Sequence, residues 1–333
     1  MVLHGYSTLL EEVPLPGATA RRLVTPEGLR NDDLGQRLAD LRDRVEEEGD
    51  QSPVVGGVLD HLRHVQWHYT VEVSDPAKCH DWAEESQVLL ENESGAILDP
   101  DGRVIIGEGT NGSGRVPLQD DAVERAARVR RDLAARDIIV PDGALPVRSP
   151  QEVRLRRPDL VGRRAVALVF TADFAISILE GQPLNWKAMS GVFPLSFGDR
   201  TPIELELFET EDERLAQRLK WGYEAAAALL AMCGRVNLVF PTDFADQGQV
   251  WNSSVGVEEP ALLPSLELLP KEEICEAWER ARALHHAMTL RTPGVRSPGG
   301  VDPQIVRQRY RALEWLTGSE AWDDVSIDVP VWA

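Results

Sequence analysis

The sequence has few cysteines, few lysines and no hydrophobic run long enough to cross a membrane. Its three cysteines, Cys79, Cys233 and Cys275, lie far apart, and their odd number argues against a disulfide framework and favours a reducing cytoplasm. Only four of the 35 basic residues are lysine, which we interpret as the mark of a GC-rich bacterial genome. The N-terminus also lacks the basic-then-apolar pattern of a signal peptide.

Apolar and charged residues both point to a soluble protein. The longest apolar stretch, residues 165–179, contains Asp173 and is shorter than the ~18 residues of a membrane span, so it predicts a buried helix. Fifty-five acidic residues against 35 basic ones give a net charge of −20. This balance argues against nucleic acid and anionic membranes as partners, and it would steer a basic protein partner towards the chain.

The length and the order of patterns predict an α+β protein with two domains. At 333 residues the chain exceeds the ~250–300 at which a single hydrophobic core stops growing. We expect a small N-terminal α/β unit with a hairpin in residues 1–115 and a helix with a Pro-rich connector in 116–150. A larger, mostly α-helical domain follows in 151–333.

In the N-terminal part, alternating and helical patterns are interspersed. Residues 65–73 alternate apolar and polar side chains, which predicts a half-buried strand. Asp99–Gly102 reads as a hairpin turn, because Pro presets φ and Gly accepts a positive φ. The other expected elements are a helix over 32–48 capped by Asn31 or Asp32, a helix over about 76–90, and strands over 96–98 and 103–106.

In the remainder of the chain, the apolar periodicity is helical. The expected helices cover residues 119–136, 159–180, 211–233, 271–291 and 303–317. Residues 234–270 are expected to be rich in loops, because their prolines prevent a long helix. We find no internal repeat, which excludes solenoid folds.

Several short motifs in this half carry a family resemblance. They are Lys220–Glu224, Arg307–Leu316, Trp322–Val325, and Leu145–Val153 followed by Arg163–Ala165. Together they resemble the bacterial family called domain of unknown function 4272, over about residues 80–330. The resemblance implies a mostly helical domain and brings no established activity.

Glu224 and Arg309 are ionisable residues on otherwise apolar helical surfaces. Because an unpaired buried charge is costly, Glu224 requires a cation or its own proton. Arg309 lies on the apolar face of the last helix and requires a planar acceptor, for which Glu224, Asp323 and Asp324 are available. We favour an internal ion-pair network of these four residues. The alternative places Glu224 as a general base and Arg309 as an anion clamp beside a cleft.

His285 lies in an apolar stripe of the helix 271–291, which is typical of a core histidine hydrogen-bonded to a carbonyl. His286 is expected near the rim of that helix. Asp173 is a further solitary acid that could join the same network.

Two motifs that resemble ligand sites are weak. Residues 107–112 satisfy G-x-G-x-x-G, but no helix opens at the last glycine, so we interpret them as an interdomain loop. A group of metal-ligand types, His61, His64, His68, Cys79 and His80, is divided between a helix and the polar face of a strand. Convergence on one metal ion is not predicted.

These observations favour a non-enzymatic role in protein interaction, such as an inhibitor, an immunity-type protein or a regulator. The aromatic residues Trp315, Trp322 and Trp332 are expected to be exposed, and Trp315 and Trp322 are expected to bind the partner. The alternative is a hydrolase or transferase for a small ligand, with Glu224, His285 and Arg309 between helices. No metal or cofactor is predicted, and the oligomeric state is left open.

Overall fold

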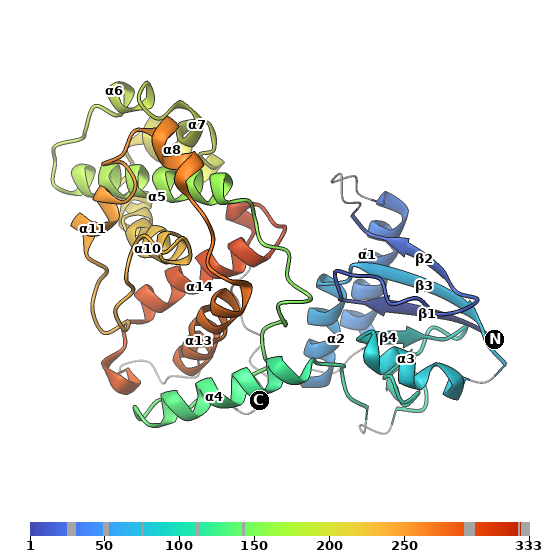
Figure 1. Ribbon diagram of the computed structural model, residues 1–333. Helices are drawn as coiled ribbons and strands as arrows, with labels where there is room; N and C mark the ends of the chain where they lie inside the picture. The colour runs from blue at the N-terminus through green and yellow to red at the C-terminus, as the bar shows by residue number, and fades with distance from the viewer. Residues whose placement is uncertain are drawn as a thin grey trace. The chain divides into compact units, whose positions relative to one another are not determined.

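The computed structural model describes residues 1–24, 31–48, 53–74, 76–110, 114–141, 144–289, 297–325 and 327. The predicted α+β class is confirmed (Figure 1), because an antiparallel sheet with a hairpin precedes a mostly helical region. The described residues divide into two compact units. We call residues 1–124 with 144–153 the sheet unit, and residues 125–141 with 154–327 the helical unit.

The sheet unit is built on an antiparallel sheet in which β1 (Val2–Ser7) is an inner strand. Within the described residues the strand order is β2-β3-β1-β4-β5-β6. The other strands are β2 (Thr19–Arg22), β3 (Trp67–Glu72), β4 (Val88–Glu91), β5 (Ile97–Leu98) and β6 (Val104–Ile106). The hairpin between β5 and β6 forms at the expected place, where Gly102 has φ of 79°. The sequence patterns did not reveal β1 and β2.

Both faces of this sheet are buried. The helices α1 (Asp32–Glu48) and α2 (Pro53–Arg63) cover one face, and α3 (His80–Glu85) packs against the other (Figure 1). Asn31 caps α1 as expected, with its side-chain oxygen accepting from the Leu34 amide at 3.1 Å. Neighbouring β3 residues such as His68 and Tyr69 are both buried, so the period-two alternation predicted for this strand does not indicate half exposure here.

The helix expected over 76–90 is wrong in its second half. Helical turns cover Pro76–Glu85, and the chain then enters β4 (Val88–Glu91), whose four residues are all buried. A short apolar run cannot by itself distinguish a helix end from a central strand. Pairing with β1 decides between them, through the register His4–Glu91 to Ser7–Val88.

The segment expected as a helix and connector is shared by the two units. The division falls inside α4 (Asp120–Ala134). Residues 144–153 join the sheet unit, where the buried Arg148 contacts Asp60 at 2.8 Å and Glu152 at 3.4 Å. The Pro-rich part therefore contributes to a core.

The helical unit is centred on two apolar helices. The helix α5 (Pro158–Leu179) packs against α10 (Gly222–Met232), every residue of which is buried. Besides the α4 residues from Arg125 onward, the described part of this unit contains α6 (Trp186–Ser190), α7 (Pro194–Gly198), α8 (Pro202–Thr210), α9 (Glu213–Leu219), α11 (Gln247–Asn252), α12 (Glu259–Leu262), α13 (Lys271–Thr289) and α14 (Pro303–Thr317). The expected helices over 159–180, 271–291 and 303–317 correspond to α5, α13 and α14.

The single helix expected over 211–233 is wrong, because the structure has α9 and α10 separated at Lys220 and Trp221. The break brings Gly222 against α5. A Cβ atom at Gly222 would lie 2.9 Å from the Leu168 carbonyl oxygen, so only glycine allows this approach.

Candidate functional site

The pair Glu224 and Arg309 lies inside the helical unit. Glu224, on α10, is 3% exposed, and Arg309, on α14, is 6% exposed. Arg309 Nε donates to Glu224 Oε2 at 2.9 Å, and Arg309 Nη2 lies 2.8 Å from the same oxygen. The two residues that stand out on apolar helices are therefore in contact with each other.

Each member of the pair also binds the chain that follows α10. Glu224 Oε1 accepts from the Ala245 amide at 2.8 Å, and Arg309 Nη1 donates to the Val239 carbonyl at 2.6 Å. A hydrogen bond to a charged group is stronger than one between neutral groups. The pair thus fastens residues 239–245 to α10 and α14.

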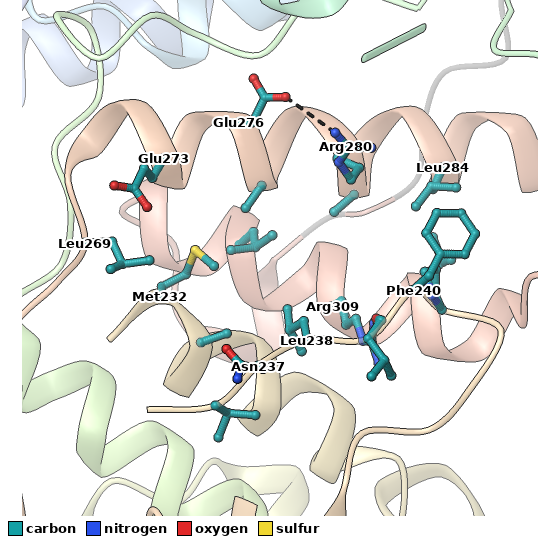
Figure 2. Close-up of a pocket in the computed structure, with 18 of the residues that line it drawn as sticks. Met232, Asn237, Leu238, Phe240, Leu269, Glu273, Glu276, Arg280, Leu284 and Arg309 are labelled. Carbon is teal, nitrogen blue, oxygen red and sulfur yellow. Dashed lines mark hydrogen bonds and ion pairs between the residues drawn. The ribbon is translucent and has the colours of Figure 1, made fainter. Parts of the chain in front are cut away.

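Beside this pair the helical unit has a pocket of about 710 Å³, shown in Figure 2 and called the helical-unit pocket. Its walls come from the end of α10, residues 236–241, α13 and α14. The apolar lining includes Met232, Val236, Leu238, Phe240, Leu269, Leu284, Val306 and Leu313. The polar lining consists of Asn237, Glu272, Glu273, Glu276, Arg280 and Arg309.

The pocket mouth carries negative charge that its own arginines do not neutralise. Glu276 lies 2.6 Å from Arg128 and 3.6 Å from Arg280, so its charge is shared. Glu272 and Glu273 are exposed, and neither has an ion pair within the described part of the chain. Figure 2 shows Glu273, Glu276 and Arg280 along α13, across the pocket from Asn237 and Leu238.

The three residues of the predicted enzyme site do not line the helical-unit pocket together. Arg309 lines the helical-unit pocket, whereas Glu224 and His285 do not. His285 is buried on α13, donates from Nε2 to the Ile327 carbonyl at 2.8 Å, and stacks on Tyr310. These contacts are those of a core histidine.

His286 is not at a rim, contrary to expectation, because it is only 6% exposed. Burial, with the charge of Arg282, lowers its pKa to about 3. Its Nε2 has no hydrogen-bond partner among the described residues. The side chain is therefore neutral in the fold and acts as part of the core.

Asp323 and Asp324 lie apart from the Glu224–Arg309 pair. Asp323 Oδ1 is 3.8 Å from Arg311, which is two residues after Arg309 on α14, and its Oδ2 accepts from the Ile203 amide at 3.4 Å. The Asp324 side chain is exposed. Of the four residues in the expected network, the structure brings only Glu224 and Arg309 together.

The expectation that Trp315 and Trp322 are exposed is wrong. They are 7% and 6% exposed and pack edge to face with ring centroids 5.7 Å apart. Arg156 lies over Trp315, while Arg164 and Arg311 lie over Trp322. These guanidinium groups cover the two rings, which the sequence pattern predicted to be exposed to solvent. Trp332 lies outside the described residues.

Asp173 binds Tyr223 instead of joining the Glu224–Arg309 pair. The Tyr223 hydroxyl donates to Asp173 Oδ1. Burial raises the pKa of the Asp173 carboxyl to about 6, although this hydrogen bond opposes the shift. Asp173, on α5, thus has a partner of its own.

The sequence patterns missed a polar cluster in the sheet unit around Glu91. Tyr6 donates to Glu91 at 2.6 Å, and Arg37 and Arg44, both from α1, contact its two carboxylate oxygens at 2.6 and 2.5 Å. Burial alone would raise the pKa of Glu91, but the hydrogen bonds from Tyr6 and Arg44 and the charges of both arginines lower it. A pocket of about 420 Å³ opens beside this cluster.

His68 also belongs to this region and is buried, not on a polar face as predicted. It stacks on His4 and Tyr6, and its Nε2 lies 3.1 Å from His4 Nδ1. Burial and the charge of Arg37 lower the pKa of His68 to about 4. The only sequence signal for this cluster was the alternation that places His4 and Tyr6 on one face of β1. It points to His68 only when the pairing of β1 with β3 is known.

The expected metal-ligand types do not form a site. His61 Nε2 donates to the Tyr6 carbonyl at 2.8 Å, whereas His68 stacks on the Tyr6 and His4 rings. Within the described ranges, no three His, Cys, Asp or Glu side chains come together to hold a metal ion. Among the same residues, none of the helices has both the length and the apolar character needed to cross a membrane.

Most of the helical unit lies in the part of the chain that matches a known family. The sequence model described as Domain of unknown function (DUF4272) matches residues 125–325, more than half of the chain. The chain belongs to this family. The DUF4272 match begins at residue 125, not near 80 as expected, which is where the helical unit begins. Neither the curated proteins nor the solved structures include a significant match to the chain.

Proposed function

We propose that this DUF4272 protein is a non-enzymatic interaction protein of an inhibitory, immunity-type or regulatory kind. Its helical-unit pocket binds a segment of a partner protein that carries both apolar and basic side chains. The observation that carries this proposal is the combination of apolar walls with an acidic mouth. Burial of the partner's apolar side chains against these walls would stabilise the complex. The partner's Lys or Arg side chains would complement the unpaired Glu272 and Glu273.

The charge of the whole chain supports the same class of partner. A net charge of −20 attracts a basic protein over long range and raises its association rate. The proposal includes a bacterial cytoplasmic setting. Three buried free thiols and the arginine-rich composition support that setting.

The enzymatic alternative, a hydrolase or transferase for a small ligand, has one supporting observation. Arg309 lines a pocket whose volume lies in the range of small-molecule sites. However, Glu224 does not line it, and both Glu224 oxygens accept hydrogen bonds inside the protein. A general base needs an oxygen within reach of the proton that it removes, so this geometry favours binding over catalysis.

The proposal is tested by selecting displayed random dodecapeptides against the full chain and measuring the affinity of enriched peptides by calorimetry. We expect enriched peptides to combine Lys or Arg with apolar residues. The double variant Glu272→Lys/Glu273→Lys should weaken their binding about tenfold at low salt, because two attractive contacts become repulsive. Ala277→Trp, which fills the pocket, should weaken it further.

The matched control is Glu206→Lys/Glu209→Lys on α8, which makes the same charge change at exposed positions outside the pocket. It should leave binding nearly unchanged. Enriched peptides that are acidic, or that bind all three variants equally, would show that the pocket is not the binding site.

A further inference from the structure

One wall of the helical-unit pocket has the side-chain pattern of a β-strand but no strand partner. Residues Val236–Phe240, which we call the edge segment, alternate along the chain. Val236 is buried, Leu238 and Phe240 are half-buried, and Asn237 and Val239 are exposed. Side chains of a strand point alternately to opposite faces, so this pattern is typical of a half-buried strand. The segment carries no helix or strand assignment.

Most backbone groups of the edge segment are also unpaired within the described chain. None of the amides of residues 236–240 donates a hydrogen bond within the described chain, and the carbonyls of 236–238 accept none there. Such a row of open donors and acceptors is what an edge strand offers to another chain. The edge segment borders the pocket along its length (Figure 2).

The edge segment is held in place at both ends. Before it, the Arg235 guanidinium donates to the carbonyl and the hydroxyl of Ser265 at 2.7 and 2.6 Å. After it, the Pro241 carbonyl accepts from the Asp302 amide at 2.8 Å. Between these points Arg309, fixed by Glu224, holds the Val239 carbonyl. A segment anchored in this way loses little further freedom when a partner pairs with it.

We propose that the partner binds by strand addition: an extended peptide pairs with the edge segment through backbone hydrogen bonds. Its apolar side chains enter the pocket, and its Lys or Arg side chains reach Glu272 and Glu273 across from the segment. This inference rests on the proposed function and names its mode of recognition. The open backbone and the alternation favour an extended occupant over a helical one, and the acidic α13 wall favours a basic one.

The test uses two synthetic peptides with the full-length protein. The probe is acetyl-(Val-Lys)5-amide, whose apolar residues share one face of a strand. The control has the same composition in the order VKKVVKKVVK, whose apolar residues share one face of a helix. We expect the probe to bind about tenfold more tightly, because its backbone hydrogen bonds are added to the shared side-chain contacts.

Amide exchange by NMR gives the second readout. With the probe bound, alternate amides of the edge segment, either 237 and 239 or 236, 238 and 240, should exchange at least about tenfold more slowly than the rest of the unit's exposed amides. Glu272→Lys/Glu273→Lys should abolish this slowing, and Glu206→Lys/Glu209→Lys should not.

The possible failures are distinct. If the helical-pattern control binds equally or better without slowing these amides, strand addition is overturned, while the pocket remains the interaction site. If neither peptide binds, a basic extended segment is not the occupant. The displayed-peptide selection decides the proposed function separately.

Discussion

Each unit of this protein buries a glutamate against arginine, but the two arrangements differ in how far water is excluded. In the sheet unit, the side chains of Arg37 and Arg44 around Glu91 are 38% and 37% exposed. In the helical unit, the Arg309 side chain is 7% exposed and that of Glu224 is 3% exposed. Removing one member of a desolvated pair is costly, because the remaining charge stays buried without solvation by water.

The two arrangements also connect different parts. Both arginines of the Glu91 cluster come from α1, so the cluster attaches one helix to the sheet. The Glu224–Arg309 pair joins two helices to a loop that borders a pocket. The same chemical pair therefore docks a helix onto a sheet in one unit and fixes a loop beside a pocket in the other.

The largest expected effect comes from breaking the more buried pair. Glu224→Ala leaves the Arg309 guanidinium buried without its carboxylate, and we expect a loss of about 3–5 kcal/mol in the unfolding free energy of the helical unit. Native-state hydrogen exchange of α10 amides measures it without interference from the sheet unit.

Glu224→Leu/Arg309→Met provides the control for that experiment. Replacing both charges should recover only part of the loss, because the Ala245 amide and the Val239 carbonyl still lose their partners. If Glu224→Ala lowers the unfolding free energy by less than about 1 kcal/mol, the pair does not hold the loop and the two helices together as described.

A smaller effect is expected when the partly exposed cluster is broken. Glu91→Ala should lower the stability of the sheet unit by about 1–3 kcal/mol, because water can solvate Arg37 and Arg44 while the Tyr6 hydroxyl loses its acceptor. The Glu91 pKa is lowered in the fold, so its contribution is fully present above the ordinary value of 4.5 and is lost as pH falls through the folded pKa. Urea unfolding at pH 7 and pH 3 should therefore show the variant approaching the parent at low pH.

Buried histidines allow a third comparison, of acid sensitivity. His61 in the sheet unit and His286 in the helical unit both have pKa values lowered to about 3, mainly by burial. Both are neutral in the fold, whereas the unfolded chain takes up a proton below about 6.5, so stability falls as pH drops from there towards 3. His61→Leu and His286→Leu should each make their own unit less acid-sensitive.

At pH 7 the two substitutions should differ. His61→Leu removes the bond to the Tyr6 carbonyl and should cost about 1 kcal/mol, whereas His286→Leu should cost less. Thermal unfolding from pH 7 to pH 4 checks both. Equal costs at pH 7 would mean that the Tyr6 contact contributes nothing.

The smallest effect is expected at Asp173, whose pKa shift is opposite to that of Glu91. Because the Asp173 pKa is raised to about 6, the fold favours the protonated acid, and stability falls as pH rises from about 4 to 6. Asp173→Asn should be neutral or more stable than the parent at pH 7, by up to about 0.5 kcal/mol, and should lose this advantage at pH 3.5. An advantage that grows at pH 3.5 would contradict this sign.

The sequence predicted elements best where local patterns act alone. The helix over 303–317 and the turn at Asp99–Gly102 needed only capping, periodicity and turn chemistry. The break between α9 and α10 depends on the approach of Gly222 to α5, and β4 depends on pairing with β1. Such partners are distant in sequence, so a single-segment pattern could not show them.

The site was predictable to a similar degree. Isolated charges on apolar helices pointed to Glu224 and Arg309, because a buried charge must find an opposite one. Their contacts with Ala245 and Val239 depend on the path of a loop, which periodicity does not describe. The burial of Trp322 depends on arginines that come from two different helices.

Asp302 caps α14 by accepting from the Gln304 amide at 2.7 Å, while its own amide holds the Pro241 carbonyl. One residue therefore belongs both to the start of a core helix and to the border of the pocket. Any molecule that occupies the pocket will raise the melting temperature of this unit by mass action, by the equivalent of about 2.7 kcal/mol at a hundred times its dissociation constant. A calorimetric scan in which the unfolding transition of the helical unit shifts, while that of the sheet unit stays fixed, can thus show that a compound binds this pocket before its biological role is known.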